Sequence, residues 1–349
     1  MKNVSVSIII PCRNEEKYIE PFLQTIFLQD YPKEKIQILL IDGLSTDRTR
    51  EIINTYCSIY KNIILLDNPN KTVPYALNIG IRNATGDIII RLDAHAIYPH
   101  NYISTLVYYL EKLNADNVGG VWETIPANSG LIPKSIAIAL STPFGVGNAT
   151  YRVVKETNLE YVEVDTVPFG CYRKSVFEKY GLFDEQLTRN QDNEFNERII
   201  SGGGKIFLIP SLKIKYFARE NYSKHFIMFY QYGYFGPLVD IKLKRFTRLR
   251  RYIPTLFLLS LIIPIFLGLF WFPIFYISIF SGTIYFITLL TVSVYESLKT
   301  KNIILFPFIL SAYFISHISY GLGYLIGFYD FVLQKKHKKL KKIEVQLSR

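Results

Sequence analysis

The sequence predicts an α/β fold with a mainly parallel sheet over residues 1–240, followed by a membrane region over residues 241–349. In the first region, short runs of Val, Ile and Leu alternate with stretches of helical periodicity, which is typical of βαβ units. In the second region, residues 252–295 contain no charged side chain. As a helix this run would be roughly twice as long as the hydrocarbon layer is thick, so more than one membrane segment is expected.

The first strand is expected at residues 4–10, directly before Pro11. A helix should follow over residues 15–28, because its apolar side chains fall on one face. These side chains are Ile19, Phe22, Leu23, Ile26 and Phe27. Three further strands are expected at residues 36–41, 62–66 and 87–92. Continuous apolar runs of this length are typical of buried parallel strands.

The intervening helices have recognisable starts. Ser45 or Thr46 can cap a helix that runs through Tyr60, and Pro74 lies in the first turn of the next helix. The pattern loosens over residues 122–170, which suits binding loops. A last helix of this region is expected over residues 190–200, where three glycines end it.

The membrane region predicts a helical hairpin that turns near residues 271–273. Its apolar segments are residues 252–271, 274–295 and 303–328. Basic stretches flank them at residues 242–251 and in the tail 334–349. If both basic stretches are cytoplasmic, the number of crossings must be even, whereas three apolar runs give an odd number. Either the third run does not cross, or the tail lies outside; the sequence leaves both open.

Composition excludes several classes of protein. The 40 Lys and Arg residues against 29 Asp and Glu give a net charge of +11, concentrated beside apolar runs. This pattern favours a membrane surface over nucleic acid. Three widely spaced cysteines (Cys12, Cys57 and Cys171) argue against a disulfide framework and a zinc site. The first apolar run is too short for a signal peptide, so the N-terminal region is expected in the cytosol.

Acidic residues follow the predicted strands, at the sheet edge where α/β proteins bind ligands. Glu15 could accept hydrogen bonds from a ribose or base, or simply mark an acidic helix start. Asp42 is placed to bind a uracil imide or a ribose hydroxyl, and Asp47 could equally cap the next helix. Asp93 and His95 together could hold Mg²⁺ or Mn²⁺ beside a diphosphate.

Three other positions each have a functional and a structural interpretation, and one pair of glycines has a structural one. Asp192 could be a general base or an ordinary acidic helix start. Lys71 could pair with a diphosphate or be a solvated turn residue. His317, inside an apolar run, could be functional or neutral and hydrogen-bonded to a neighbouring helix. Gly323 and Gly327 have the spacing of close helix packing.

Taken in order, these motifs resemble those of the family 2 glycosyltransferases, which are inverting enzymes with the GT-A fold. The resemblance covers about residues 4–220. VSIIIPCRNEE is similar to the opening strand of that family, and LLIDGLSTDRT to its nucleotide-binding motif. ALNIGIRNATGDIIIRLDAH is similar to its stretch ending in D-x-D. VPFGCYRKSVFEKYGLFDE and RNQDNEFNERIISGG are similar to its acceptor-side motifs.

The resemblance implies a set of roles. Asp192 would be the catalytic base, and Asp93 with His95 would hold the metal. The expected donor-binding residues are Pro11, Arg13, Glu15, Asp42, Asp47, Lys71, Asn78 and Asp93. The expected acceptor-side residues are Gly170, Glu185, Gln191 and Arg219.

The sequence departs from the family pattern at three positions. Gly43 stands where the nucleotide motif has its second Asp, His95 where D-x-D has its last Asp, and Gln191 where an acid usually precedes the base. The Q-x-x-R-W motif of processive synthases is absent, so addition of a single sugar is expected. The D-A-H variant and the apolar C-terminal region resemble the succinoglycan-type, exopolysaccharide-building branch.

The resulting hypothesis is a hexosyl transfer from a UDP-sugar to a polyprenyl-linked saccharide, with Mg²⁺ or Mn²⁺ as cofactor. The protein is expected in the plasma (inner) membrane as a multi-pass protein with a cytoplasmic catalytic domain. Other polysaccharide-assembly enzymes are possible partners. Residues 221–238 could be an interfacial element, or could pack against the catalytic domain. Its tyrosines at headgroup depth would be Tyr222, Tyr230, Tyr232 and Tyr234.

Two alternatives stay open. One is transfer of a sugar directly to polyprenyl phosphate, which needs the same donor site. The other is a non-catalytic, membrane-tethered subunit that binds nucleotide sugars, since His95 and Gln191 depart from the family pattern. A transporter is less favoured, because no inverted repeat is visible.

Overall fold

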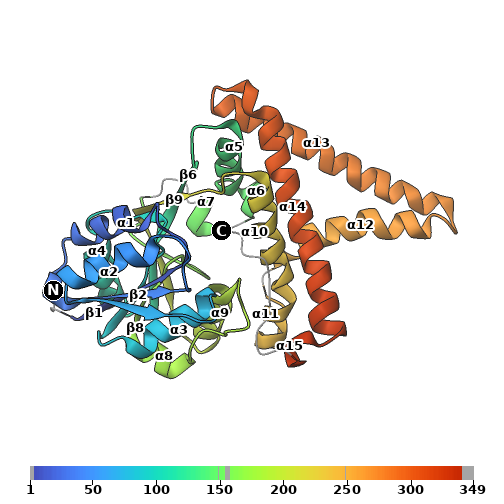
Figure 1. The fold of residues 1–349 in the computed structure, drawn as a ribbon. Helices are drawn as coiled ribbons and strands as arrows, with labels where there is room; N and C mark the ends of the chain where they lie inside the picture. Colours follow the sequence, from blue (N-terminus) through green and yellow to red (C-terminus); the bar gives the residue numbers. More distant parts are fainter. Residues whose placement is uncertain (1–3, 148, 154–157, 248, 340–349) are drawn as a thin grey trace. The chain divides into compact units, whose positions relative to one another are not determined.

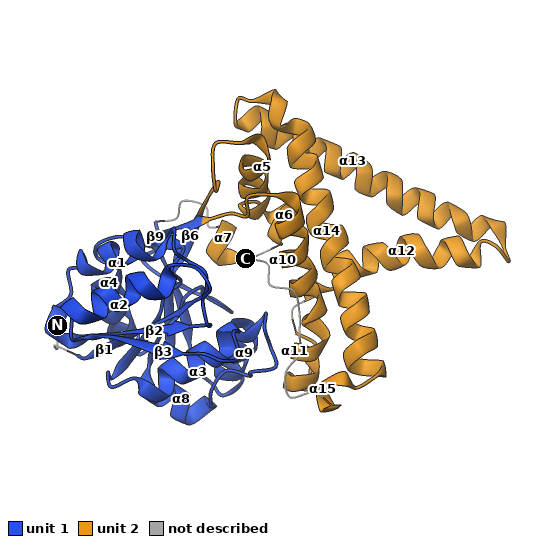
Figure 2. Ribbon diagram, viewed as in Figure 1, with its two compact units in different colours: residues 1–123, 154–216 blue, residues 124–153, 217–349 orange. Residues whose placement is uncertain are grey.

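The computed structural model describes residues 4–147, 149–153, 158–247 and 249–339. The chain forms two compact units, coloured separately in Figure 2. Unit 1 comprises residues 1–123 and 154–216, and unit 2 comprises residues 124–153 and 217–349. The compact units therefore divide the chain differently from the single boundary expected at residue 240. The reason is that part of the expected loop region, residues 124–153, belongs with the C-terminal helices.

Unit 1 is built on a nine-stranded sheet in the order β3-β2-β1-β4-β8-β6-β9-β5, with β7 paired to β9. The parallel strands are β1 (Val6–Cys12), β2 (Ile36–Asp42), β3 (Ile63–Asp67) and β4 (Ile88–Arg91). The others are β5 (Ala96–Ile97), β6 (Asn117–Ile125), β7 (Val162–Glu163), β8 (Cys171–Arg173) and β9 (Ile206–Phe217). The predicted fold class and its four leading strands are confirmed; the antiparallel pairings beyond β4 make the sheet mixed.

Helices cover both faces of this sheet (Figure 1). The helices are α1 (Ile19–Phe27), α2 (Thr49–Ile59), α3 (Val73–Asn83), α4 (Tyr102–Lys112), α8 (Lys174–Tyr180) and α9 (Gln191–Ser201). Ile8 and Ile10 of β1 share one apolar core with Phe22 of α1 and Leu106 of α4. Ile9 points the other way, where a Cβ on Gly80 of α3 would lie 2.4 Å from its Cγ2. Alternate residues of one strand thus serve two helix layers.

Unit 2 is mainly helical within its described residues. Its N-terminal helices are α5 (Leu131–Leu140), α6 (Pro143–Val146) and α7 (Thr150–Val153). The later helices are α10 (Tyr222–Tyr234), α11 (Gly236–Leu243), α12 (Ile253–Leu267), α13 (Phe275–Lys299), α14 (Phe306–Phe328) and α15 (Lys336–Lys339). Ile136 of α5, Met228 of α10 and Ile309 of α14 share one buried core. This core explains why residues 124–153 join unit 2.

Helices α10 and α14 pack with almost no space between their backbones. A Cβ on Gly323 would lie 2.1 Å from the carbonyl oxygen of Tyr230, and one on Gly327 would lie 2.0 Å from that of Tyr234. A Cβ on Gly233, on the other helix, would lie 2.0 Å from the carbonyl oxygen of Tyr320. Only glycine fits at such approaches, so the spacing of Gly323 and Gly327 serves close helix packing.

Polar contacts also join the helices of unit 2. Tyr222 of α10 donates to the carbonyl oxygen of Phe308 at 2.8 Å, and Tyr234 donates to Asp330 at 2.6 Å. These tyrosines therefore stabilise the pairing with α14, and an interfacial position for residues 221–238 stays a prediction. His317 of α14 lies 2.7 Å from the carbonyl oxygen of Phe144 and 3.1 Å from the Tyr285 hydroxyl. It thus has the hydrogen-bonded, structural environment that was one of its two interpretations.

The predicted helical hairpin is present, with a turn of 3₁₀-helix at Phe272–Ile274 between α12 and α13. Two of the three apolar segments form helices long and apolar enough to cross a membrane, Phe272–Lys299 and Ile303–Leu333. The remaining segment forms α12, whose 15 residues extend about 22 Å. That length is short of the roughly 30 Å of a hydrocarbon core.

Candidate active site

The carboxyl ends of the parallel strands bring the predicted acids to one edge of the sheet. Cys12 pairs with Asp42, and Asp42 pairs with Asp67, so three strands end at the same level. On the other side of β1, Arg91 ends β4 and Asp93 follows two residues later. The edge predicted to bind a ligand therefore carries charged side chains from β2, β3 and the turn after β4.

Two loops at this edge are held together by hydrogen bonds. The Asn14 N–H donates to Ser45 Oγ at 2.8 Å, and the Thr46 N–H donates to Asn14 Oδ1 at 2.8 Å. The Glu15 N–H donates to Thr49 Oγ1 at 2.8 Å. Residues 13–16 and 43–49 therefore form one rigid rim, and Glu15 keeps its place although the helix α1 begins only at Ile19.

Asp47 fastens the same rim. It accepts hydrogen bonds from the backbone N–H groups of Thr49 at 3.0 Å and Glu16 at 3.2 Å. Although burial raises it, these hydrogen bonds lower the pKa of Asp47 overall. Asp47 therefore stays ionised and stabilises the start of α2, which was one of its two interpretations; a donor contact stays a prediction.

Asp42 is the buried centre of an ion network. Its carboxylate is fully buried and accepts hydrogen bonds from the backbone and hydroxyl of Ser45. Arg50 Nη1 lies 2.6 Å from Asp42 and 2.7 Å from Asp67. One guanidinium thus joins the ends of β2 and β3. Sequence reasoning missed Arg50 and Asp67, although the position of Asp67 at a strand end was a usable signal.

Arg13 explains the glycine in the nucleotide motif. The Arg13 side chain lies against Gly43, where a Cβ would be 3.2 Å from Arg13 Cβ and Cδ. Its Nε is buried without a hydrogen-bond partner. An aspartate at position 43 would therefore crowd Arg13, so the glycine leaves the space that the Arg13 side chain occupies.

Asp93 and His95 face each other in the turn after β4. His95 Nε2 lies 3.8 Å from Asp93 Oδ2, and His95 Nδ1 lies 2.9 Å from Glu15 Oε1. The Tyr98 hydroxyl accepts from the Asp93 backbone N–H at 2.9 Å and so fixes the turn. No group of three or more His, Cys, Asp or Glu with metal-binding geometry occurs among the described residues.

The residues present nevertheless fit a divalent cation. A carboxylate and an imidazole nitrogen face one another, and Glu15 can accept a hydrogen bond from the N–H of the other ring nitrogen. Histidines that bind metals usually donate their second N–H to a carboxylate or carbonyl in this way. Asp93 and His95 would hold the ion, with the remaining ligands coming from a diphosphate and water.

Asp192 lies in the first turn of α9, after Asn190, whose left-handed backbone (φ 64°) turns the chain into the helix. Arg91 Nη1 lies 2.5 Å from Asp192 Oδ1, and Arg91 Nη2 lies 3.2 Å from Asp93 Oδ1. The predicted base and the predicted metal ligand therefore contact the same guanidinium. A role for Arg91 was not predicted from the sequence, because only the acidic residues of the motif were given functions.

Asn78 and Glu185, predicted on the donor and acceptor sides, are hydrogen-bonded to each other. Asn78 Nδ2 donates to Glu185 Oε1 and to the carbonyl oxygen of Phe183, both at 2.9 Å. Asn78 Oδ1 accepts from the Phe183 N–H at 3.0 Å. These contacts give Asn78 a structural role in joining α3 to the turn at residues 183–185, and its donor contact stays a prediction.

The other predicted residues have diverse surroundings. Pro11 pairs with Ile41 within the sheet, and Lys71 is an exposed turn residue with a left-handed backbone (φ 62°). Gly170 accepts from the Arg91 N–H at 3.1 Å and has Tyr172 Oη where a Cβ would lie. Gln191 is buried at the start of α9. Arg219 is buried in unit 2, so its role at the site stays a prediction.

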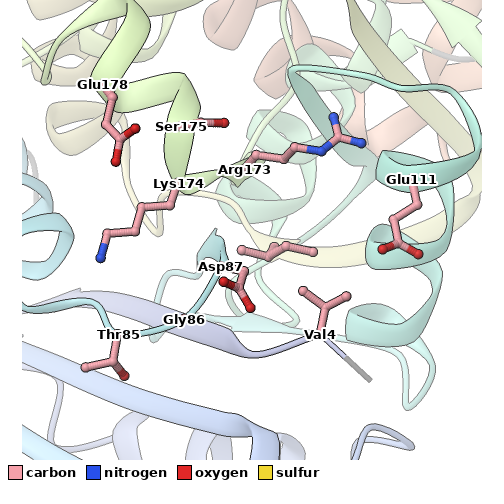
Figure 3. A pocket seen from close by; sticks show the side chains of 10 residues that line it. Val4, Thr85, Gly86, Asp87, Glu111, Arg173, Lys174, Ser175 and Glu178 are labelled. Carbon is pink, nitrogen blue, oxygen red and sulfur yellow. The ribbon is translucent and has the colours of Figure 1, made fainter. Parts of the chain in front are cut away.

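Two other features lie outside this chemistry. A pocket of about 390 Å³ opens at the opposite strand ends, where Val4 and Asp87 line it (Figure 3). Its cations bind backbone carbonyls, since Lys174 donates to Ala84 and Arg173 to Ala115. Burial, then the charge of Asp42, raises the pKa of the Cys12 thiol well above its usual value, so Cys12 is not a nucleophile at neutral pH.

Comparison with known proteins identifies the family. Residues 7–181 match the model of Glycosyl transferase family 2. A dolichyl N-acetyl-alpha-D-glucosaminyl phosphate diacetamido-dideoxy-glucuronosyltransferase of Methanococcus voltae is 35% identical over 237 residues, covering 65% of this chain and 71% of the relative. Succinoglycan biosynthesis protein ExoA of Rhizobium meliloti is 27% identical, covering 67% and 69% respectively.

Solved structures share the fold at low identity. A mannosyltransferase of Pyrobaculum calidifontis in complex with GDP-Man and Mn²⁺ aligns with a TM-score of 0.53 at 18% identity, over 90% of this chain and 87% of that one. S. aureus TarS in complex with UDP-GlcNAc aligns with a TM-score of 0.51 at 15% identity, over 72% and 70%. The chain has the GT-A fold, is a glycosyltransferase and belongs to glycosyl transferase family 2.

Proposed function

We propose that the protein transfers one sugar, with inversion, from a UDP-sugar to a lipid-linked saccharide at the cytoplasmic face of a membrane. The observation that carries this proposal is the arrangement around Arg91. A carboxylate suited to a donor-bound metal, Asp93, and a carboxylate suited to general base catalysis, Asp192, contact one buried guanidinium at the strand edge.

The nucleotide would bind beside the rim formed by residues 13–16 and 43–49. The Asp42–Arg50–Asp67 network offers both a hydrogen-bond acceptor and a donor, which suits the imide N–H and carbonyl oxygens of uracil. Arg13, whose Nε is buried without a partner, offers a second donor there. Glu15 would contribute to the donor site indirectly, through its contact with the His95 ring.

The departing diphosphate would lie near Asp93 and His95. A divalent cation held there supplies positive charge that stabilises the leaving group. Asp93 is already oriented, because Tyr98 fixes its backbone and Arg91 contacts its side chain. These residues hold the site in shape before a donor binds, which is the condition for electrostatic stabilisation without reorganisation.

Asp192 would remove the proton from the acceptor hydroxyl. The acceptor oxygen forms its bond to the anomeric carbon while the bond from that carbon to the diphosphate breaks, and attack from the opposite face inverts the configuration. The side chain of Asp192 is about one third exposed (32%), so a hydroxyl can reach it. Two residues predicted on the acceptor side lie beside this pair. Gly170 accepts a hydrogen bond from the Arg91 N–H, and Gln191 directly precedes Asp192 in the chain.

A lipid-linked saccharide is the favoured acceptor. The Methanococcus relative is named for transfer to a dolichyl N-acetylglucosaminyl phosphate, which is a lipid-linked sugar, and the Rhizobium relative for succinoglycan biosynthesis. We therefore expect the reaction product of this chain to be an intermediate in the assembly of a cell-surface polysaccharide or glycan. These names favour an acceptor that already carries a sugar over free polyprenyl phosphate.

The two basic stretches support one orientation in the membrane. They flank α12 and α14, and Tyr252 and Tyr324 both donate to Asp240, at 2.8 and 3.2 Å. Asp240 lies just before the first basic stretch and Tyr324 lies near the end of α14, so the two basic stretches lie close together. The part of the expected tail at residues 340–349 lies outside the described residues.

This proximity favours an even number of crossings. Both basic stretches then lie on the cytoplasmic side, which satisfies the positive-inside rule. The exposed side chains of Phe246 and Leu249, beside the basic residues, suit the interfacial layer.

The test is release of UDP from a panel of UDP-sugars by the full chain in detergent, with Mg²⁺ or Mn²⁺. Turnover with one sugar is expected. Asp192→Asn should lower it by at least about a hundredfold, because general base catalysis contributes that much, while UDP binding changes little. Metal-dependent UDP binding without turnover of any sugar, with or without a lipid-linked saccharide, would favour the binding-subunit alternative.

A further inference from the structure

Arg91 is an unusually constrained arginine. It is 7% exposed, its backbone N–H donates to the carbonyl oxygen of Gly170 at 3.1 Å, and its guanidinium lies 5.8 Å from the centre of the Phe169 ring. A buried cation is stable only when carboxylates or other acceptors surround it. The position of this guanidinium is therefore fixed by the end of β4 and by its two carboxylates.

The two carboxylates are held unequally. Nη1 of Arg91 is 2.5 Å from Asp192 Oδ1, whereas Nε and Nη2 are 3.3 and 3.2 Å from Asp93 Oδ1. Charge-assisted hydrogen bonds of good geometry are shorter than 3 Å. The stronger bond therefore goes to Asp192, and the contact to Asp93 is the weaker of the two.

The bond to Asp192 also selects which oxygen does chemistry. Arg91 contacts Oδ1 of Asp192. Since Oδ1 is engaged by Arg91, Oδ2 is the oxygen left to receive the proton of an acceptor hydroxyl if Asp192 acts as the base. A base held by one oxygen loses less freedom when the acceptor binds, and orientation of this kind is worth a large part of a catalytic effect.

On the basis of the proposed function, we propose that Arg91 is a positioning residue for the transfer reaction. It holds Asp192 by Oδ1 so that Oδ2 meets the acceptor hydroxyl, and it makes the placement of the base depend on the strand that carries the donor ligand Asp93. Arg91 itself does not touch the reacting atoms.

The test is a double-mutant cycle on the rate of UDP-sugar hydrolysis, in which water replaces the unidentified acceptor. The full chain is compared with Arg91→Met, Asp192→Asn and the double variant. Arg91→Met should lower kcat by about thirtyfold while KM for the donor changes less than about threefold. In the Asp192→Asn background the same substitution should have almost no further effect, since residues that act as a unit are not additive.

Two variants separate positioning from folding. Arg91→Lys keeps a charge that reaches one carboxylate and should restore part of kcat. Arg173, on the neighbouring strand β8, binds the carbonyl oxygens of Ala115 and Leu110 instead of a carboxylate. Arg173→Met should lower the thermal unfolding midpoint and leave kcat and KM unchanged.

Additive effects of Arg91→Met and Asp192→Asn, or an equal loss of donor binding and kcat, would overturn the positioning role. A wild-type chain that neither hydrolyses a donor nor transfers a sugar to a lipid-linked saccharide refutes the proposed function instead. In that event the same four chains are compared by thermal unfolding: non-additive midpoints support the Arg91–Asp192 bond in solution, and additive midpoints overturn it.

Discussion

The strand edge of unit 1 and the α10–α14 pair of unit 2 are organised by opposite means. At the strand edge, carboxylates from different segments are held at set distances by arginines, the half-buried Arg50 for Asp42 and Asp67 and the buried Arg91 for Asp93 and Asp192. In the helix pair, the contact depends on the absence of side chains at Gly233, Gly323 and Gly327. Charge fixes position in one region, and shape fixes it in the other.

This difference indicates which kind of substitution destabilises each region. A charged network loses most when one partner is removed, because the remaining charge is left buried. A glycine contact loses most when an atom is added, because the backbones have to separate. The two regions should therefore respond to opposite kinds of substitution.

The largest effect is expected for Gly323→Leu. Its Cβ would overlap the carbonyl oxygen of Tyr230, so α10 and α14 have to move apart and unit 2 should lose about 3 kcal/mol or more of unfolding free energy. Thermal unfolding in detergent measures this. Gly282→Leu is the matched control, since a Cβ there meets only Leu261 at 3.5 Å. Equal unfolding midpoints for the two variants would show that the close backbone approach at Gly323 does not stabilise the α10–α14 pair.

A smaller effect is expected for Asp42→Asn. Arg50 would lose its buried carboxylate partner, and UDP binding should weaken by about tenfold, which is about 1.4 kcal/mol. Asp67→Asn removes a partner whose side chain is 60% exposed, so binding should change less than about twofold. Titration calorimetry with UDP and Mn²⁺ checks both. A larger loss for Asp67→Asn would mean that the exposed end of the network is the one that reads the nucleotide.

At neutral pH the smallest effect is expected from a polar group inside the helix pair, and this effect grows as the pH falls. His225 of α10 is fully buried, lies 2.8 Å from the Ser316 hydroxyl, and has its pKa lowered to about 3 by burial, with the charge of Arg152 adding to this. Because the unfolded chain binds this proton near pH 6.5 and the folded chain does not, stability is full above pH 6.5 and falls as the pH drops toward 3.

The slope attributable to His225 is at most about 1.4 kcal/mol per pH unit. Unfolding midpoints of the wild type and His225→Gln between pH 4.5 and 7.5 measure it, because the carboxylates that also titrate are common to both chains. The wild type should lose more stability than the variant across this range. Parallel curves for the two chains would show that His225 is protonated or accessible in the folded state.

The parallel half of the fold was predictable because its signals are local. The strands β1 to β4 each contain a continuous apolar run, and Asp42 and Asp93 stand at or just beyond strand ends. The short antiparallel strands β5, β7 and β8 contain two or three residues each and leave no periodic pattern to read. Their pairing comes from tertiary contacts.

The partners of the site acids were less predictable than the acids. Arg50 and Arg91 lie within a helix and a strand, where an arginine has no distinctive spacing, and their roles appear only when distant segments meet. Arg91 and Asp192 are far apart in the sequence, and Asn78 and Glu185 likewise. The composition of unit 2 could not be foreseen either, because α5 shows no sign of belonging with α14 until Ile136 and Ile309 share a core.

The discontinuity of unit 2 has a consequence for synthesis on the ribosome. Helix α5, with its buried residues Ile136 and Leu140, emerges long before the residues Ile309 and Ala312 of α14 that share its core. At about 5–20 residues per second the delay is roughly 10 to 30 seconds. During that time unit 1 can complete its sheet, and until Met228 of α10 emerges the apolar face of α5 has no partner from its own unit. A growing chain therefore has a long interval in which a chaperone or the bilayer surface is the natural cover for that helix.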